Sequence, residues 1–299
     1  MIRIGVDLGG TKIAACALDD SGRELVRRRV ATPQGDYQRT IEEIAALVRS
    51  VEIELGQSAT VGIGFPGSVS ARTGRHRNAN STCLNDQDFV GDLQRVLQRE
   101  IRGANDANCL ALSESFDGAG AHARVVFAVI IGTGTGGGIV VDQKIIVGRN
   151  AIAGEWGHSP MPGTDRAERR ARPCYCGQVG CIEQFLAGPA LEAEYMRHES
   201  VHRPLEEIAS RASAQVDPSA TAVIELLCER LADALAVVVN TLDPDAIVIG
   251  GGVSNIPEIY RHTPHLIAER IFSDQFETPI RPAMFGDASG VRGAARLWG

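Results

Sequence analysis

The sequence contains no hydrophobic run long enough to cross a membrane. Its longest apolar stretch, residues 125–131, is far shorter than the about 20 residues that a spanning helix requires. The first residues enter a strand-like run directly, without the charged start, apolar stretch and cleavage site of a signal peptide. We therefore expect a cytoplasmic protein that has no membrane partner.

The chain has fewer basic residues than acidic residues. The chain has 30 Lys and Arg against 37 Asp and Glu, which gives a formal net charge of −7. A chain with this balance has little affinity for a polyanion, so we expect no nucleic-acid partner. The arginines at 27–29 and at 166, 169, 170 and 172 are accordingly interpreted as solvated faces.

A disulfide framework is lacking as well, because the seven cysteines are odd in number and unevenly spaced. Three of them, Cys174, Cys176 and Cys181, form a C-x-C-x4-C pattern among glycines, and His158 lies upstream. Three thiolates and one imidazole complete a tetrahedral zinc site with no position for water, which indicates a structural zinc rather than a hydrolase. The alternative is three reduced cysteines without a ligand.

Short apolar strands alternate with segments of helical periodicity, which predicts a mixed α/β protein. Hydrophobic residues make up 44% of the chain, enough for a sizeable core, and the length favours two domains. The opening unit of strand, glycine turn and strand recurs at residues 125–141, which indicates two similar lobes. Further helices are predicted at residues 36–55, 91–100, 106–116, 219–242 and 256–271, with a terminal helix from residue 290.

Glycine is in excess, with 33 in 299 residues, or about 11% where about 7% is usual. Three glycine-rich turns, at residues 7–12, 132–138 and 250–252, each follow an apolar strand and together hold ten of these glycines. Glycine lets backbone N–H groups approach an anion closely, so the turns favour a nucleotide site with Asp7 placed to hold Mg²⁺. The alternative is that each turn serves only as a hairpin or a packing turn.

Asp106 is a candidate general base. It lies at a predicted helix start, where Asn105 or Asp106 could equally serve as an N-cap. If a phosphate donor binds nearby, the same carboxylate could accept the proton of an attacking hydroxyl. Spacing alone favours the cap and does not decide between the two roles.

Seven motifs together resemble the ROK family of sugar kinases from end to end. They are DLGGTK at 7–12, GIGFPG at 62–67, NDAN at 105–108, GTGTGGG at 132–138, GEWGH at 154–158, CYCGQVGCIE at 174–183 and GGG at 250–252. Further segments look most like bacterial fructokinases, or manno(fructo)kinases: residues 32–33, 78–82, 173–177, 242–245 and 289–295.

The resemblance implies an actin-like, hexokinase-type ATPase fold with two lobes around a central cleft. We expect an N-terminal α/β lobe at residues 1–118, joined by a C-terminal helix at about 288–299. The C-terminal α/β lobe is expected at residues 119–287 and includes the zinc-binding loop. A homodimer is also implied by the resemblance.

The resemblance also implies site residues. Asp106 matches the family's catalytic base. The ATP and Mg²⁺ positions are Asp7, Gly9, Gly10, Thr11, Lys12, Gly132, Thr133, Gly134, Gly250, Gly251 and Gly252. The positions that match sugar-binding residues are Gly67, Asn80, Asn105, Asp106, Glu155, His158 and Glu183. His158 would serve both the sugar and the zinc through its two ring nitrogens.

The expected activity is transfer of the γ-phosphate of MgATP to the 6-hydroxyl of a hexose. Fructose is the expected sugar, with mannose next, and a glucokinase or an N-acetylhexosamine kinase is the alternative. A sugar-responsive transcriptional regulator of the same family is disfavoured, because regulators carry a helix-turn-helix before the first phosphate loop and here that loop begins at Asp7.

Overall fold

Two five-stranded sheets form the frame of the protein in a computed structural model that describes residues 1–299. The chain divides into two units, which are described separately. The first comprises Met1–His122, Gly138–Gly154 and Met284–Gly299, and the second comprises Ala123–Gly137 and Glu155–Ala283. Residues 138–154 therefore fall in the first unit, whereas the sequence placed them in the C-terminal lobe.

The first sheet has the strand order β3-β2-β1-β4-β7. The strands β1, β2 and β3 pair antiparallel, whereas β1, β4 and β7 are parallel neighbours. Parallel strands end at the same edge of a sheet, so the residues that follow β1, β4 and β7 converge. The bounds are Arg3–Leu8 for β1, Lys12–Leu18 for β2, Glu24–Ala31 for β3, Thr60–Phe65 for β4 and Ile101–Asn105 for β7.

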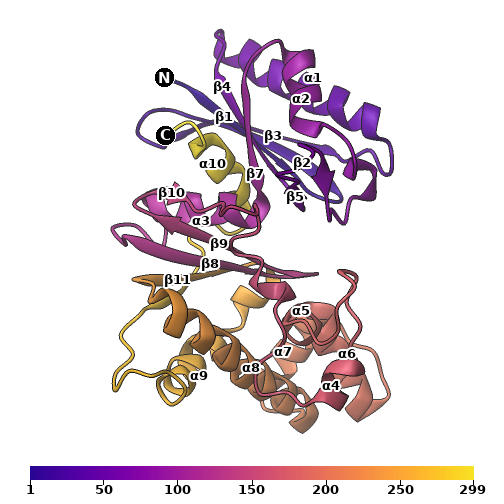
Figure 1. The fold of residues 1–299 in the computed structure, drawn as a ribbon, viewed down its shortest axis with the longest axis vertical. Coiled ribbons are helices and arrows are strands. Elements are labelled where there is room, and N and C mark those ends of the chain that lie inside the picture. Colours follow the sequence, from indigo (N-terminus) through magenta and orange to yellow (C-terminus); the bar gives the residue numbers. More distant parts are fainter. The chain divides into compact units, whose positions relative to one another are not determined.

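Both faces of this sheet are buried, because alternate residues of each strand point to opposite sides. On one side Ile13, Ala15 and Ala17 of β2 join a core with helices α1 (Tyr37–Leu55) and α2 (Phe89–Leu97). On the other side Ala14, Cys16 and Leu18 pack against the last helix, α10 (Ser289–Arg296), which lies beside β1 and β4 in Figure 1. Helix α3 (Asp106–Asp117) packs against α10.

Helix α10 touches the sheet backbone itself. A Cβ atom at Gly62 would lie 1.9 Å from the carbonyl oxygen of Ala294, so only glycine permits this approach. The buried carboxylate of Glu114 in α3 accepts from the amides of Met284 and Phe285 and from the Ser289 hydroxyl at 2.8–3.2 Å. Some of the excess glycine therefore serves packing rather than a ligand.

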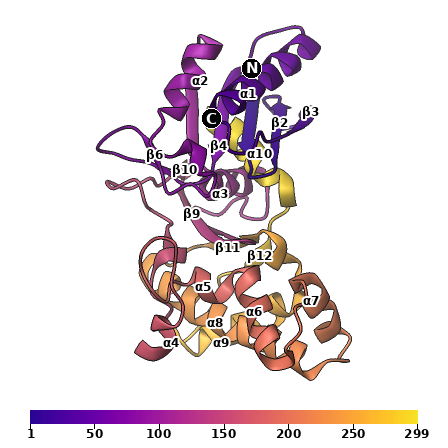
Figure 2. The same cartoon turned by 90° about the vertical axis from the view of Figure 1, so that its right-hand side faces the viewer.

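The second sheet has the order β10-β9-β8-β11-β12, and β8, β11 and β12 run parallel. Its strands are β8 (Val125–Ile131), β9 (Thr135–Val141), β10 (Lys144–Ile145), β11 (Ala246–Gly250) and β12 (Ile280–Pro282). The second unit also contains α4 (Arg166–Arg170), α5 (Glu183–Leu186), α6 (Gly188–Glu199), α7 (Leu205–Ser213), α8 (Pro218–Leu242) and α9 (Pro257–Ala268). Helices α8 and α9 lie side by side (Figure 2). None of the helices combines the length and hydrophobicity needed to span a membrane.

Strand β9 differs from the expectation for the second glycine turn. The sequence assigned all of residues 132–138 to a turn, but β9 begins at Thr135 and includes three of the glycines. Gly138 is needed for packing, because a Cβ there would lie 2.5 Å from the carbonyl oxygen of Ala107. The turn itself is therefore confined to residues 132–134.

Candidate active site

Three predicted site residues lie at one edge of the first sheet. Asp7 is near the end of β1, Gly67 follows β4, and Asn105 ends β7. The register brings them together, because Asp7 pairs with Gly64 and Phe65 pairs with Asn105. The Asn105 side-chain amide donates to the Gly67 carbonyl at 3.0 Å.

Asn105 is the N-cap of helix α3. The sequence allowed either Asn105 or Asp106 in this role. The Asn105 side-chain oxygen accepts from the amide of Ala107 at 2.9 Å. Asp106 is the first residue of the helix, and its carboxylate accepts from the same amide at 2.8 Å. A helix N-terminus stabilises negative charge, so this position suits a carboxylate that works in its ionised form.

The carboxylate of Asp106 acts on the charge of Asp7. The pKa of Asp7 is raised to about 7, first by burial and then by the carboxylates of Asp106 and Asp287, against the opposing effect of Lys12. Lys12 donates to Asp287 at 2.9 Å. A cation at Asp7 would relieve the repulsion between these acidic groups, so the first unit offers a place for the Mg²⁺ that accompanies ATP.

The turn between β1 and β2 is fixed from its outer side. Thr32 donates its hydroxyl hydrogen to the Gly9 carbonyl at 2.8 Å, and Gln34 donates to the Gly10 carbonyl. The backbone of Thr11 accepts from the amide of Thr32 at 3.0 Å. Thr32 therefore supports the predicted phosphate loop. In the sequence it was noted only as part of a segment that resembles fructokinases.

At some glycines of the predicted phosphate loops the fold itself would accept a larger residue. A Cβ at Gly10 or Gly252 would meet no atom within 4 Å, and one at Gly132 would meet only the Gly252 amide at 3.9 Å. None of these three has a positive φ. Because the backbone does not demand glycine there, these positions fit loops that leave room for a bound anion.

Asn80 lies on an exposed loop of the first unit. Its side-chain oxygen accepts from the amide of Ser81 at 2.8 Å. The preceding residue, Ala79, is held by Asn85, whose side chain accepts from its amide at 3.0 Å and donates to its carbonyl at 3.2 Å. Asn85 thus positions the loop that carries Asn80, a role that the sequence did not reveal.

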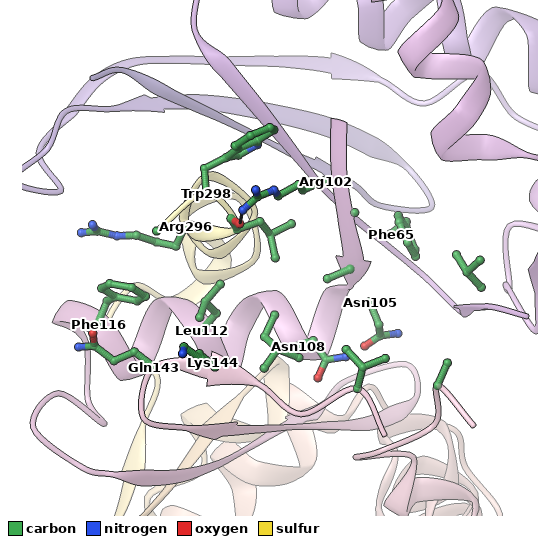
Figure 3. A pocket seen from close by; sticks show the side chains of 18 of the residues that line it. Phe65, Arg102, Asn105, Asn108, Leu112, Phe116, Gln143, Lys144, Arg296 and Trp298 are labelled. Carbon is green, nitrogen blue, oxygen red and sulfur yellow. Dashed lines mark hydrogen bonds between the residues drawn. The ribbon is translucent and has the colours of Figure 1, made fainter. Parts of the chain in front are cut away.

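A cavity of about 760 Å³ lies along helix α3 within the first unit. Asn105, Asn108, Leu112 and Phe116 line it from the helix at intervals of three or four residues, and Trp298 lies above it (Figure 3). The side-chain oxygen of Asn108 is buried without a hydrogen-bond partner. Asn105 is the residue common to this cavity and the predicted sugar site.

The second unit brings its two glycine loops together. Strands β8 and β11 are parallel, with Gly250 paired to Ile130, so residues 132–134 and 251–252 follow at the same sheet edge. Gly251 has a φ of +81° and lies so close to Ile131 that a Cβ would be 2.4 Å from its carbonyl oxygen. Thr133 lies in the turn that the Gly132 amide closes on the Gly134 carbonyl at 2.9 Å.

The turn at residues 155–158 and Glu183 lie beside the start of β9. Trp156, in this turn, donates from its indole to the Gly136 carbonyl at 2.9 Å. Glu183 is buried at the start of α5 and accepts from the Thr135 amide at 3.0 Å. The Thr135 hydroxyl is buried without a partner. Burial, and then Glu183, raise the pKa of Glu155, whereas His158 lowers it.

The predicted zinc ligands are assembled in the second unit. The ligand atoms of His158, Cys174, Cys176 and Cys181 all lie within 4.8 Å of one another. The sulfurs of Cys176 and Cys181 are 3.6 Å apart, and the Cys174 sulfur is 3.6 Å from His158 Nδ1. Tetrahedral zinc with sulfur ligands at about 2.3 Å requires separations of about 3.8 Å, so the four residues fit this metal.

Arg172 is not a solvated arginine, which corrects the expectation for this position. Its guanidinium stacks 4.3 Å from the centre of the Phe185 ring and donates to the Gln184 carbonyl at 2.8 Å and to Glu194 at 3.0 Å. Arg230 stacks on the same ring at 4.8 Å. The backbone next to the cysteine loop is therefore tied to α5, the helix that begins with Glu183.

Comparison with known proteins identifies relatives over the whole chain. The ROK family profile matches residues 3–299. An N-acetyl-D-glucosamine kinase of Yersinia pseudotuberculosis is 36% identical, with 98% of this chain and 97% of the relative covered. An N-acetyl-D-glucosamine kinase of Escherichia coli is 38% identical, with 98% of each chain covered.

Solved structures show the same fold. The ROK hexokinase of Thermus thermophilus has a TM-score of 0.86 and 31% identity, with 99% of this chain and 97% of that chain covered. A ROK family glucokinase of Streptomyces griseus, in complex with glucose and AMPPNP, has a TM-score of 0.82 and 27% identity, with 99% of each chain covered. The expected hexokinase-type fold is confirmed, whereas the narrower likeness to fructokinases is not supported by these relatives.

Proposed function

The chain belongs to the ROK family, and we propose that it is an ATP-dependent kinase that phosphorylates the 6-hydroxyl of N-acetyl-D-glucosamine. The observation that carries the reaction type is the position of Asp106 at the start of α3, beside Asp7 and at the edge where β1, β4 and β7 end. The substrate is proposed from the relatives at 36–38% identity over almost the whole chain.

In the proposed reaction, Asp106 accepts the proton of the sugar hydroxyl as its oxygen attacks the γ-phosphorus, and the bond from that phosphorus to the bridging oxygen of ADP breaks. The Lys12 ammonium would hold phosphate oxygens, together with amides of the loops at 9–12 and 132–134 other than those of Gly9 and Gly132, which donate to the carbonyls of Lys12 and Gly134. The loop at 250–252 lies near the adenosine. Asp7 would hold Mg²⁺, which would supply charge neutralisation to the phosphates.

The sugar is proposed to contact the positions that match sugar-binding residues of the family, namely Gly67, Asn80, Asn105, Glu155, His158 and Glu183. Carboxylates and amides present acceptors and donors to ring hydroxyls, and their fixed positions distinguish one sugar from another. His158, Cys174, Cys176 and Cys181 would hold zinc, which would tie the turn at 156–158 to the cysteine loop. Glucose is the second candidate, because the hexokinase and glucokinase structures have the same fold at 31% and 27% identity.

A coupled ADP-release assay on the purified chain tests this proposal. N-acetyl-D-glucosamine, glucose, mannose and fructose are each titrated at saturating MgATP, and the phosphorylated position is assigned by NMR. We expect the highest kcat/KM with N-acetyl-D-glucosamine, with phosphate on the 6-oxygen. A higher kcat/KM with fructose or glucose contradicts the substrate, and no release with any of the four sugars contradicts the kinase.

A further inference from the structure

A buried histidine lies behind the loop that carries Gly67. His76 begins β6 (His76–Arg77; Figure 2), and only 1% of its surface is exposed. Its ring meets those of Phe65 and Phe89 edge to face, with centres 4.8 and 5.8 Å apart. A polar ring buried among aromatic rings is costly unless it is hydrogen-bonded, and an apolar side chain would fill the same space without that cost. Packing alone therefore does not explain a histidine here.

The ring forms its hydrogen bond with the loop backbone. Nε2 of His76 lies 2.7 Å from the carbonyl oxygen of Pro66, the residue before Gly67. A carbonyl oxygen only accepts, so Nε2 carries the hydrogen and donates it. Burial lowers the pKa of His76, so the ring is neutral and has this single hydrogen, and Nδ1 is buried without a partner. The Pro66 carbonyl thus receives the only donor of the side chain.

This hydrogen bond orients the peptide that joins Pro66 to Gly67. Gly67 has a φ of +81°, and a Cβ there would lie 2.5 Å from the carbonyl oxygen of Arg77, so the loop packs directly against the strand that carries His76. The next carbonyl, that of Gly67, accepts from the side-chain amide of Asn105 at 3.0 Å. The bond from His76 therefore acts on the backbone that joins two positions assigned to the sugar.

The backbone of His76 is itself held on both of its polar groups. Its amide donates to the Gln87 carbonyl at 2.9 Å, and its carbonyl accepts from the Asp86 amide at 2.8 Å. Strand β6 also pairs with β5 (Ser68–Val69), which directly follows Gly67. A side chain anchored in this way can hold the Pro66 carbonyl in a fixed place.

We propose that His76 is a positioning residue of the sugar site, and that its Nε2 hydrogen, bound to the Pro66 carbonyl, holds Gly67 and through it Asn105 in the arrangement that receives the hexose. The proposal rests on the proposed function, since it concerns the same site. His76 is too deeply buried to touch a sugar, so it acts only through the loop. Loss of its hydrogen bond should weaken sugar binding and leave ATP binding unchanged.

Two variants separate the ring from its hydrogen bond. His76→Phe keeps a ring between Phe65 and Phe89 and removes the donor, whereas His76→Gln removes the ring and keeps an amide N–H at about the place of Nε2. Binding of N-acetyl-D-glucosamine is measured by calorimetry, and KM for each substrate by ADP release. We expect His76→Phe to raise the sugar Kd and KM about 3- to 10-fold, with the ATP KM within about twofold of the unmodified value. His76→Gln should bind the sugar within about twofold of the unmodified chain, although its Tm falls.

Tyr37→Phe is the matched control. The Tyr37 hydroxyl donates to Asp92, and its ring meets Phe89 edge to face with centres 6.5 Å apart. The variant therefore loses one hydrogen bond beside the same aromatic cluster without reaching Pro66, and its sugar Kd should not change. If Tyr37→Phe weakens sugar binding as much as His76→Phe does, a general loosening of this cluster explains both, and the proposal is overturned.

The remaining outcomes are equally decisive. An unchanged sugar Kd in His76→Phe overturns the proposal, and so does equal weakening in both His76 variants, which would show that the ring matters and its donor does not. If His76→Gln does not fold, the comparison of His76→Phe with Tyr37→Phe decides by the same criteria. If the unmodified chain phosphorylates no sugar, the proposed function fails. If that chain is active and His76→Phe binds normally, only the present inference fails.

Discussion

The carboxylate of Glu183 accepts a hydrogen bond from the backbone amide of Thr135 at 3.0 Å. Glu183 belongs to the proposed sugar site, and Thr135 directly follows the proposed phosphate loop at 132–134. The same carboxylate oxygen would lie 2.8 Å from a Cβ at Gly134, so the missing side chain of Gly134 leaves room for it. The buried Glu183 carboxylate, assigned to the sugar, thus contacts the backbone next to the loop assigned to the ATP phosphates.

Replacing Glu183 should separate these two roles. The side-chain oxygen of Glu183→Gln can still accept from the Thr135 amide, whereas Glu183→Ala leaves this amide without a partner. We expect both variants to raise the sugar KM, but only Glu183→Ala to raise the ATP KM, by about 3- to 10-fold for one lost hydrogen bond. Steady-state kinetics with each substrate varied in turn checks this. An unchanged ATP KM in Glu183→Ala would show that the contact does not support the phosphate loop.

Gly10→Ala tests whether this glycine serves a ligand. A Cβ there meets nothing in the protein, so we expect a Tm within about 2 °C of the unmodified chain. The methyl group would obstruct phosphate approach, so the ATP KM should rise about tenfold. Gly62→Ala is the matched control, because its Cβ would lie 1.9 Å from the Ala294 carbonyl oxygen and should cost about 2 kcal/mol or more of unfolding free energy. A normal ATP KM in Gly10→Ala would remove this residue from the site.

The sequence was most informative where pattern and local chemistry coincide. The helix start at Asp106 was predicted from its cap and periodicity, whereas Asp7 and Asn105 were marked as site residues only by the family motifs. The structure brings these two residues to one sheet edge because β1, β4 and β7 are parallel neighbours, and the sequence did not predict that edge. The start of β9 was misplaced, because glycines in a strand look like glycines in a turn when the neighbouring helix is unknown. Contacts between distant positions, such as Lys12 with Asp287, leave no local pattern.

Other features depended on packing or on fine geometry. Helix α6 buries only Gly188, Leu191 and Tyr195, so its sequence shows little apolar periodicity and no helix was predicted there. Arg172 looked solvated because the aromatic ring that it covers is supplied by α5. The choice among hexoses depends on the positions of hydroxyl and acetamido contacts, which motifs shared across the family do not encode.

Asp106→Asn should abolish most turnover while leaving the fold intact. The amide oxygen of asparagine can still accept from the Ala107 amide, so the helix start is kept, but asparagine cannot take the sugar's proton. We expect kcat to fall at least about 100-fold, as is typical for loss of a general base. ADP release and circular dichroism measure the two effects. A variant with near-normal kcat would show that Asp106 is not the base.

The cysteine loop should bind zinc stoichiometrically. Elemental analysis of the protein purified without chelator should find about one zinc per chain, because the four ligand atoms fit a closed tetrahedral site. Cys176→Ser should lose most of the metal and lower Tm by several degrees, whereas Cys83→Ser, outside the cluster, should do neither. Zinc well below one per chain in the unmodified protein would contradict the site.

Asp7 should make the ligand-free protein less stable as the pH rises. Because its folded-state pKa of about 7 exceeds the unfolded value of about 3.9, protonation favours folding. The stabilisation is fully present below pH 4 and is lost as the pH rises through 7. Asp7→Asn lacks this loss, so its unfolding free energy relative to the unmodified chain should increase by about 2 kcal/mol between pH 5 and 8.

Urea unfolding in EDTA, without nucleotide, measures this difference at both pH values. Asp19→Asn is the control, because the hydrogen bond from Ser21 lowers the pKa of Asp19 and because Asp19 is not among the charges that act on Asp7. Its contribution is present above the unfolded pKa and is lost only as the pH falls, so its effect should stay constant between pH 5 and 8. A constant difference for Asp7→Asn as well would show that Asp7 is ionised throughout. In that case repulsion from Asp106 and Asp287 would not raise the pKa of Asp7 in the ligand-free protein. The physical argument for a cation at Asp7 would then fail.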